Sequence, residues 1–258
     1  MLKKKSSKGA TWIDLESPTI EEVTQAAEEA GIPTETAQEL LSPTSKHKIE
    51  FGENHAYLVL HFPSFKESRD GDAAFEVDFL ITSSVIITAH YGHIEAFDKI
   101  EVADESEKEL FFTILGTLLE NFERKLSSVD HWVRDIEKKM FSGKEKEAIF
   151  ALSEASRHLT DFKKITAIYP DAFESLKKGG EKIFGKKFAL GTNALGERSS
   201  KASAKLAVLS EWASELRETN SALLGIKQNE TMKVLTVLTF ISDLIIGGAL
   251  IYLALNGH

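Results

Sequence analysis

The pattern of apolar and polar positions changes sharply near residue 235. From Leu235 to Leu255 the chain has 21 residues with a single charged side chain, Asp243. About 20 apolar residues are enough for a helix to cross the hydrocarbon core of a bilayer. The pattern therefore predicts one transmembrane helix over 235–255. The alternative is a buried helix of a soluble protein, although such a run is long for a globular core.

The first 105 residues carry the mixed helix and strand signals of an α/β domain. Runs rich in β-branched and aromatic residues predict strands at 11–15, 48–51, 57–62, 75–80 and 85–88, with the last two forming a hairpin. Thr19 and Glu22 form a capping-box pattern, which begins a helix that ends near Gly31. A second short helix is expected over 34–41. Residues 1–105 are thus predicted to form a mixed sheet with flanking helices.

The middle of the chain has helical periodicity. Apolar residues recur at steps of three and four from Glu107 to Met140, and a second helix is expected from Lys144 to Ile168. Glycines between 179 and 196 predict a solvated loop. Residues 106–196 are therefore predicted to be a helical hairpin region and loop, followed by a stalk helix over 197–234 that leads into the transmembrane helix.

One face of the stalk helix has a heptad-like spacing of apolar residues with one asparagine. We call this face the seam, and its members are Leu206, Leu209, Ala213, Leu216, Asn220 and Leu223. Such spacing is typical of helices that pack against copies of themselves. The seam predicts that stalk helices join copies of the chain into a homo-oligomer.

Composition and charge narrow the classes of function. The chain of 258 residues has a formal net charge of −9, which argues against nucleic acid as the main partner, and it has no cysteine. No phosphate-binding loop, nucleophile elbow or zinc-protease motif is present, so nothing in the sequence indicates an enzyme. His90 and His93 lie three residues apart beside a predicted strand end, and we interpret them as exposed turn residues rather than metal ligands.

Basic residues on one side of the apolar run predict the orientation of the chain. Lys227 and Lys233 precede the run, and only His258 follows it. Excess Lys and Arg stays on the cytoplasmic side of a membrane. The N-terminal domain is therefore expected in the cytoplasm, anchored to the cell membrane by the C-terminal helix.

Several short motifs occur in a fixed order. Residues 12–15 read Trp-Ile-Asp-Leu, 18–22 read Pro-Thr-Ile-Glu-Glu, 48–50 read Lys-Ile-Glu and 57–60 read Tyr-Leu-Val-Leu. Residues 229–236 read Asn-Glu-Thr-Met-Lys-Val-Leu-Thr, at the entry to the apolar run. This ordered set resembles the CorA family of divalent-cation channels, and the last motif is similar to the entry of that family's first transmembrane helix.

The resemblance implies a function and an assembly. It implies a passive channel for divalent cations, chiefly Mg²⁺ but also Co²⁺, that is closed by Mg²⁺ bound on the cytoplasmic side. It also implies a cyclic homo-oligomer, a pentamer, in the cell membrane. The choice among Mg²⁺, Co²⁺, Ni²⁺ and Zn²⁺ stays open.

The resemblance also suggests residues of a cation path. Met232 and Leu235 match pore-facing gate positions, and Thr239 and Asp243 follow on the same helical face. Asn256 corresponds to a remnant of the family's outer Gly-Met-Asn motif. The alternatives are an apolar stripe that faces lipid or a neighbouring helix, and an acid left in a decayed pore.

Three glutamates are candidate ligands for a regulatory cation. Glu39 matches an acidic ligand on a short helix of the family, and Glu197 lies near the stalk position from which a neighbouring copy supplies its partner. Glu218 matches an acidic position of the cytoplasmic funnel. Mg²⁺ is usually bound by one or two carboxylates and several waters. The alternative is that these are surface glutamates of helices.

The sequence as given differs from the family pattern at its end. It reaches His258 without a Gly-Met-Asn motif or a second apolar segment, so the chain is expected to lack both. Two alternatives to a channel follow. One is a non-conducting, membrane-anchored metal-sensing or regulatory subunit, and the other is a truncated transporter product.

Overall fold

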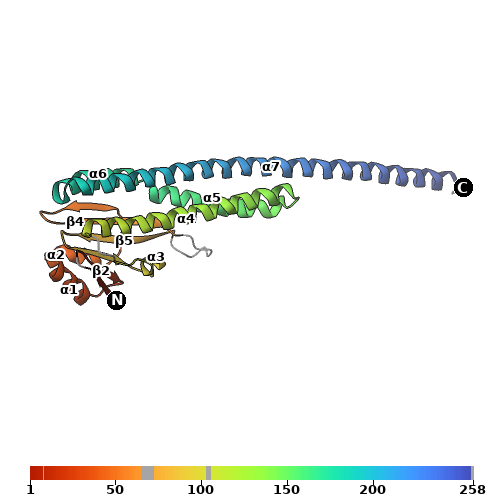
Figure 1. Cartoon of the computed structure of the whole chain (residues 1–258). Coiled ribbons are helices and arrows are strands. Elements are labelled where there is room, and N and C mark those ends of the chain that lie inside the picture. The colour runs from red at the N-terminus through yellow and green to blue at the C-terminus, as the bar shows by residue number, and fades with distance from the viewer. Residues whose placement is uncertain (8, 65–72, 103–105, 257–258) are drawn as a thin grey trace. The chain divides into compact units, whose positions relative to one another are not determined.

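The computed structural model describes residues 1–7, 9–64, 73–102 and 106–256 (Figure 1). The chain divides into two compact units. The first comprises Met1–His131 and Arg157–Ser210, and the second comprises Trp132–Ser156 and Glu211–His258.

A six-stranded sheet in the order β1-β2-β6-β5-β4-β3 is the centre of the first unit. Its strands are β1 (Leu2–Ser6), β2 (Thr11–Glu16), β3 (Lys48–Phe51), β4 (Ala56–Pro63), β5 (Ala74–Ile81) and β6 (Val85–His90). Strands β2 and β6 pair in parallel, and the other neighbours are antiparallel. The predicted hairpin is confirmed as β5 and β6. The α/β mixed sheet predicted for this part of the chain is also confirmed.

Strand β1 was missing from the prediction because its sequence, Leu-Lys-Lys-Lys-Ser, lacks the apolar pattern of a strand. It forms an edge of the sheet as far as the structure describes the chain, and it pairs with β2. Lysines are common on edge strands, since their charges discourage pairing with another chain. The basic start of the chain is therefore part of the fold.

Apolar side chains cover both faces of the sheet, and each face has its own helices (Figure 1). One face packs against α1 (Ile20–Ala30), α2 (Thr34–Ala37) and the 3-10 helix η1 (Gln38–Leu41), with Val23 and Leu40 among the buried residues. The other packs against α3 (Glu95–Asp98), α4 (Glu107–Phe141), α6 (Tyr169–Phe184) and the start of α7 (Lys186–Asn256), with Phe111 and Phe188 buried. Burial on both sides explains why β4 and β6 are rich in apolar residues and almost wholly buried.

The first helix begins and ends as the sequence predicts. The hydroxyl of Thr19 accepts a hydrogen bond from the amide of Glu22 at 3.3 Å, and the Glu22 carboxylate accepts one from the amide of Thr19 at 3.1 Å. Gly31 ends the helix with a φ of 66°, a left-handed conformation that glycine adopts without strain.

The glycine-rich region is helical, and the loop predicted there was wrong. Helix α5 (Glu145–Thr166) is followed by α6, by a single break at Gly185 with a φ of 83°, and by α7, which begins at Lys186. The glycines serve close packing. A Cβ at Gly180 would lie 2.3 Å from the ring of Phe188, and one at Gly191 would lie 2.3 Å from the ring of Phe112. Aromatic rings therefore rest directly on the helix backbone, which only glycine permits.

The predicted seam between copies was also wrong, because the chain buries the seam itself. Its first five members are at most 5% exposed: Leu206, Leu209, Ala213, Leu216 and Asn220. Within the second unit, the Arg134 guanidinium of α4 lies 5.2 Å from the ring centroid of Trp212 on α7. A heptad-like stripe of apolar residues indicates that a helix packs against a partner, but it does not identify the partner. Here the partner is the helical hairpin of the same chain.

Candidate functional site

The C-terminal part of α7 is an apolar helix that nothing in the described chain covers. Helix α7 contains a segment long and apolar enough to cross a membrane, and none of that segment is buried. Phe240, Leu244 and Ile245 are each more than 60% exposed. A helix that is apolar all round needs an apolar surrounding, either lipid or other helices. The helix predicted over 235–255 is therefore present, as one candidate membrane span.

The residues suggested for the cation path lie on this helix. Met232 and Leu235 are 60% and 51% exposed, and Thr239 and Asp243 are also exposed. The Thr239 hydroxyl donates to the carbonyl of Leu235 at 2.9 Å, so its hydrogen is satisfied within the helix while its oxygen can still accept. Asp243 has no ion pair with any side chain that the structure describes. The backbone of Asn256 belongs to α7, but its side chain lies outside the described part of the chain.

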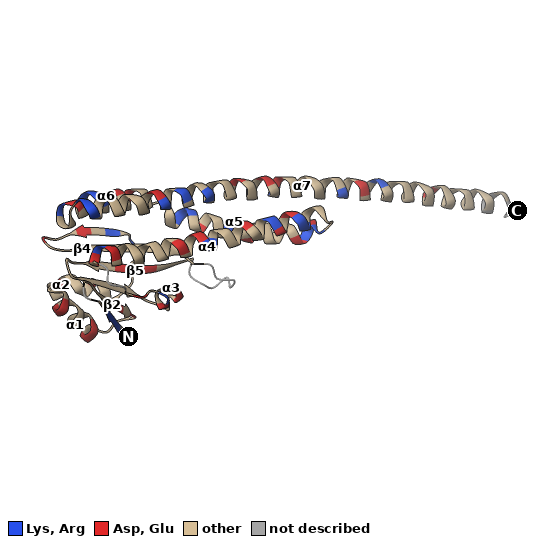
Figure 2. Ribbon diagram, viewed as in Figure 1, with Lys and Arg blue, Asp and Glu red and all other residues tan. Residues whose placement is uncertain are grey.

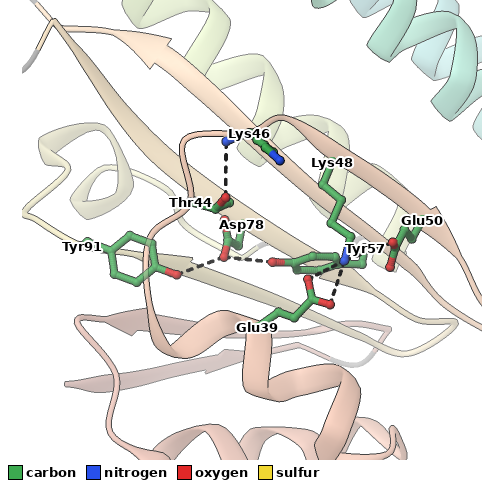
Figure 3. Close-up of polar contacts among 8 residues, drawn as sticks. All are labelled: Glu39, Thr44, Lys46, Lys48, Glu50, Tyr57, Asp78 and Tyr91. Atoms are coloured by element: carbon green, nitrogen blue, oxygen red, sulfur yellow. Dashed lines mark hydrogen bonds and ion pairs between the residues drawn. The ribbon is translucent and has the colours of Figure 1, made fainter.

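Glu39 lies on η1 and is held by a lysine (Figure 3). The ammonium of Lys48, on β3, lies 2.7 Å from both carboxylate oxygens of Glu39 and 3.0 Å from a carboxylate oxygen of Glu50. The hydrogen bonds to Glu39 are the main reason that the pKa of Lys48 is raised. A cation that bound Glu39 would have to displace this lysine.

Glu197 and Glu218 both lie on α7. The Glu197 carboxylate accepts a hydrogen bond from the amide of Asn193 at 2.8 Å and lines a groove of about 460 Å³ between α6 and α7. Glu39 and the start of α7 lie on opposite faces of the sheet. Glu218 is exposed and belongs to the second unit. Among the described residues, no three acidic or histidine side chains are grouped to hold a metal ion.

A buried carboxyl group that the sequence did not reveal, that of Asp78, lies near Glu39 and Lys48 (Figure 3). Asp78 of β5 is 0% exposed, and its Oδ2 accepts hydrogen bonds from the hydroxyls of Tyr57 at 3.2 Å and Tyr91 at 3.1 Å. Burial, and next the charge of nearby Glu76, raises the pKa of Asp78 to about 8. Asp78 is therefore mostly protonated at neutral pH. The alternation of apolar and acidic residues in 75–80 is typical of a half-buried strand, and it does not reveal that Asp78 is buried, because Tyr57 and Tyr91 are distant in sequence.

The Trp-Ile-Asp-Leu motif has a structural role. Trp12 Nε1 donates to the hydroxyl of Thr88 at 2.9 Å, and that hydroxyl donates to Asp14 Oδ1 at 2.6 Å. His90 Nε2 lies 3.2 Å from the same oxygen of Asp14. These contacts join β2 to β6, the parallel pair of the sheet.

His90 is consequently not the exposed turn residue that was expected. It is 2% exposed at the end of β6. Burial lowers its pKa, but the hydrogen bond and charge of Asp14 outweigh burial, so the pKa of His90 is raised. His93 is exposed, as expected, and lies 3.2 Å from a carboxylate oxygen of Asp98.

Comparison with known proteins identifies the family. A family model described as CorA-like Mg²⁺ transporter protein matches residues 7–244. The chain is 21% identical over 240 residues to the cobalt/magnesium transport protein CorA of Methanocaldococcus jannaschii, covering 89% of this chain and 75% of that protein. It is 19% identical over 247 residues to the protein of the same name from Thermotoga maritima, covering 92% and 70%.

A solved structure supports the same assignment at the level of the fold. The complete structure of the CorA magnesium transporter from Methanocaldococcus jannaschii superposes with a TM-score of 0.76 at 20% identity, covering 93% of this chain and 82% of that one. The mixed sheet, the long helices and the candidate membrane helix are thus features of a known fold. The family match covers most of the chain and continues past Asp243 into the candidate span, so this chain is a member of the CorA family of Mg²⁺ transporter proteins.

Proposed function

We propose that the chain carries divalent metal cations, Mg²⁺ above all, passively across the cell membrane. Co²⁺ would be a further substrate, because the relatives from Methanocaldococcus jannaschii and Thermotoga maritima are both cobalt/magnesium transport proteins by name. The observation that carries the proposal is the family match over residues 7–244, which extends from the α/β domain into the apolar part of α7. In this proposal the N-terminal domain is cytoplasmic and the chain acts as a transporter rather than an enzyme.

Copies of α7 would together form the path for the cation. One helix cannot enclose a pore, so the proposal requires a cyclic homo-oligomer, which we take to be a pentamer by resemblance. Met232, Leu235, Thr239 and Asp243 are separated by steps of three, four and four, which put them on one face of the helix. Rings of Met232 and Leu235 would form an apolar constriction that opens by wetting.

Asp243 supports this orientation on energetic grounds. A charged side chain in the hydrocarbon region is costly, and such residues usually face a cavity, a partner or an ion path. The side chain has no ion-pair partner among the described residues. A ring of Asp243 carboxylates around a central path would attract a hydrated divalent cation, and the cation would in turn offset the repulsion among the carboxylates.

Regulation by cytoplasmic Mg²⁺ would act through Glu39, Glu197 and Glu218. Since Glu39 and the start of α7 lie on opposite faces of the sheet, Glu39 and Glu197 would meet only between neighbouring copies. Mg²⁺ bound there with waters would hold the copies together and close the path. Asn256 would lie at the outer end of the path.

Cysteine substitution tests the assignment of the pore face, because the chain has no native cysteine. Thr239→Cys places a thiol on the proposed pore face, and Val237→Cys places one on the opposite side of the same helix. A positively charged thiol reagent should abolish Mg²⁺ uptake into reconstituted vesicles for Thr239→Cys and leave Val237→Cys unaffected. Equal block of both variants, or block of Val237→Cys alone, would contradict the proposed pore face.

A further inference from the structure

The turn between α4 and α5 is basic and exposed. We call residues 138–146 the hairpin tip. Its four lysines, Lys138, Lys139, Lys144 and Lys146, are all exposed, and Phe141 is 65% exposed. Figure 2 shows Lys and Arg gathered where α4 and α5 meet, with acidic residues among them. The sole acidic residue of the hairpin tip is Glu145, and Lys138 forms an ion pair of 3.0 Å with Asp135 just outside the tip. Lys139, Lys144 and Lys146 therefore supply most of the positive charge of the tip, although the whole chain is acidic.

The acid of the hairpin tip is already neutralised. Glu145 is 7% exposed, and its Oε1 lies 2.6 Å from the ammonium of Lys227 on α7. The main-chain carbonyl of Glu145 also accepts a hydrogen bond of 3.0 Å from the side-chain amide of Asn220. All these residues belong to the second unit. Two contacts therefore fix the hairpin tip beside residues 220–227 of α7.

This position brings the lysines close to the predicted membrane surface. Lys227 precedes the apolar run at Leu235 by eight residues, or about 12 Å along a helix. The headgroup layer occupies roughly 5–8 Å of that length on each side of the hydrocarbon core. The distance left between Lys227 and the outer edge of the headgroup layer is shorter than the Debye length of about 8–10 Å. An extended lysine side chain is long enough to cross it.

We propose that the hairpin tip binds the anionic headgroups of the cytoplasmic leaflet. Lysines near a membrane are attracted to its negative surface potential, and the effect falls off within a Debye length. The exposed ring of Phe141 provides an apolar group for the interface. The ion pair of Lys227 with Glu145 would then couple the charge of the leaflet to the helix that enters the membrane. This inference rests on the membrane span of the proposed function.

The test uses the full chain in nanodiscs with single labelled cysteines. A fluorophore on Ser142→Cys reports on the hairpin tip, and the matched control is Thr219→Cys, an exposed site 16 residues, or about 24 Å, before Leu235. The quencher is a lipid with a nitroxide on its headgroup. Nanodiscs of phosphatidylcholine alone are compared with nanodiscs that also contain phosphatidylglycerol.

The expected result is strong quenching at Ser142→Cys with phosphatidylglycerol and a loss of that quenching with phosphatidylcholine alone. Changing all four tip lysines to Gln, or raising the salt concentration, should lower the quenching to the level of Thr219→Cys. Quenching at the control level in both lipids would overturn the inference, as would quenching that does not depend on lipid charge. Fluorescence self-quenching between copies without lipid quenching would assign the hairpin tip to a neighbouring copy instead, and would also overturn it.

A third label separates this inference from the membrane span itself. Ile241→Cys should be quenched by nitroxides placed on acyl chains if α7 crosses the bilayer. A quenched Ile241→Cys beside an unquenched Ser142→Cys overturns only the headgroup contact. An unquenched Ile241→Cys overturns the span, and the headgroup contact falls with it.

Discussion

The side-chain amide of Asn220 donates a hydrogen bond of 3.0 Å to the main-chain carbonyl of Glu145, across 75 residues of sequence. Asn220 is fully buried, and the bond joins α7 to the first residue of α5. A buried asparagine in a heptad-like stripe commonly sets the register between helices. Here it sets the register of α7 against the hairpin of its own chain.

Replacing Asn220 should loosen the hairpin from α7. We expect Asn220→Ala to lower the free energy of unfolding by about 1–3 kcal/mol, because the substitution removes the hydrogen bond and leaves the Glu145 carbonyl without its partner. Chemical unfolding followed by circular dichroism measures the change. Thr219→Ala, at the exposed neighbouring position, should be nearly neutral. Equal stability of both variants would show that the hydrogen bond contributes nothing.

The buried seam makes a second prediction about stability. Leu216 is 5% exposed, so Leu216→Ala should cost about 2–5 kcal/mol through lost apolar contact and the cavity left behind. Val208→Ala, at a position 65% exposed, should cost far less. Light scattering below the unfolding transition should give the same mass for both variants and the wild type. A Leu216→Ala chain that is stable but dissociates would return the seam to an interface between copies.

Local patterns predicted most of the fold. The capping box of Thr19 and Glu22, the hairpin of β5 and β6 and the long helix α4 all follow from signals within a few residues of one another. Strand β1 could not be predicted in this way, because its lysine-rich segment forms a strand only through backbone pairing with β2, which is not a local signal. The glycines of α6 and α7 misled the prediction because the rings that pack on them lie elsewhere in the sequence.

The candidate site was less predictable. The apolar run and Asp243 were plain in the sequence, since a membrane span is a property of composition. The packing partner of the seam could not be predicted, because an apolar stripe on a helix does not indicate whether the partner helix belongs to the same chain or to another copy. Asp78 and His90 were missed as buried groups, because Tyr57, Tyr91 and Asp14 reach them only once the sheet has formed.

Asp78 should make stability fall as pH rises. Its pKa of about 8 in the folded chain lies above the ordinary value of 3.8, so between those pH values the folded state holds a proton that the unfolded state has lost. The free energy of unfolding should therefore decrease with pH across this window, by up to about 1.4 kcal/mol per pH unit from this group. Asp78→Asn, which stays neutral, should flatten the dependence and raise stability at pH 8. Unchanged curves for the variant would contradict a protonated Asp78.

Lys48 provides a test of metal binding at Glu39. Since Lys48 occupies both oxygens of Glu39, Lys48→Met should strengthen any Mg²⁺ binding there and enlarge the rise in thermal midpoint that Mg²⁺ causes. Glu39→Gln should reduce that rise. Glu35→Gln, an exposed glutamate of the neighbouring helix, is the control and should leave it unchanged. If Mg²⁺ shifts none of these midpoints, Glu39 is only the ion-pair partner of Lys48.

Mg²⁺ uptake into vesicles that contain the purified chain and an internal fluorescent indicator tests cation transport most directly. With an inside-negative potential, the wild type should take up Mg²⁺ faster than empty vesicles. Asp243→Asn should lower the uptake several-fold at the same oligomeric mass, because it removes the carboxylates that attract the cation. Wild-type uptake no faster than that of empty vesicles, with Asp243→Asn inserted more efficiently into the membrane, would contradict transport by this chain.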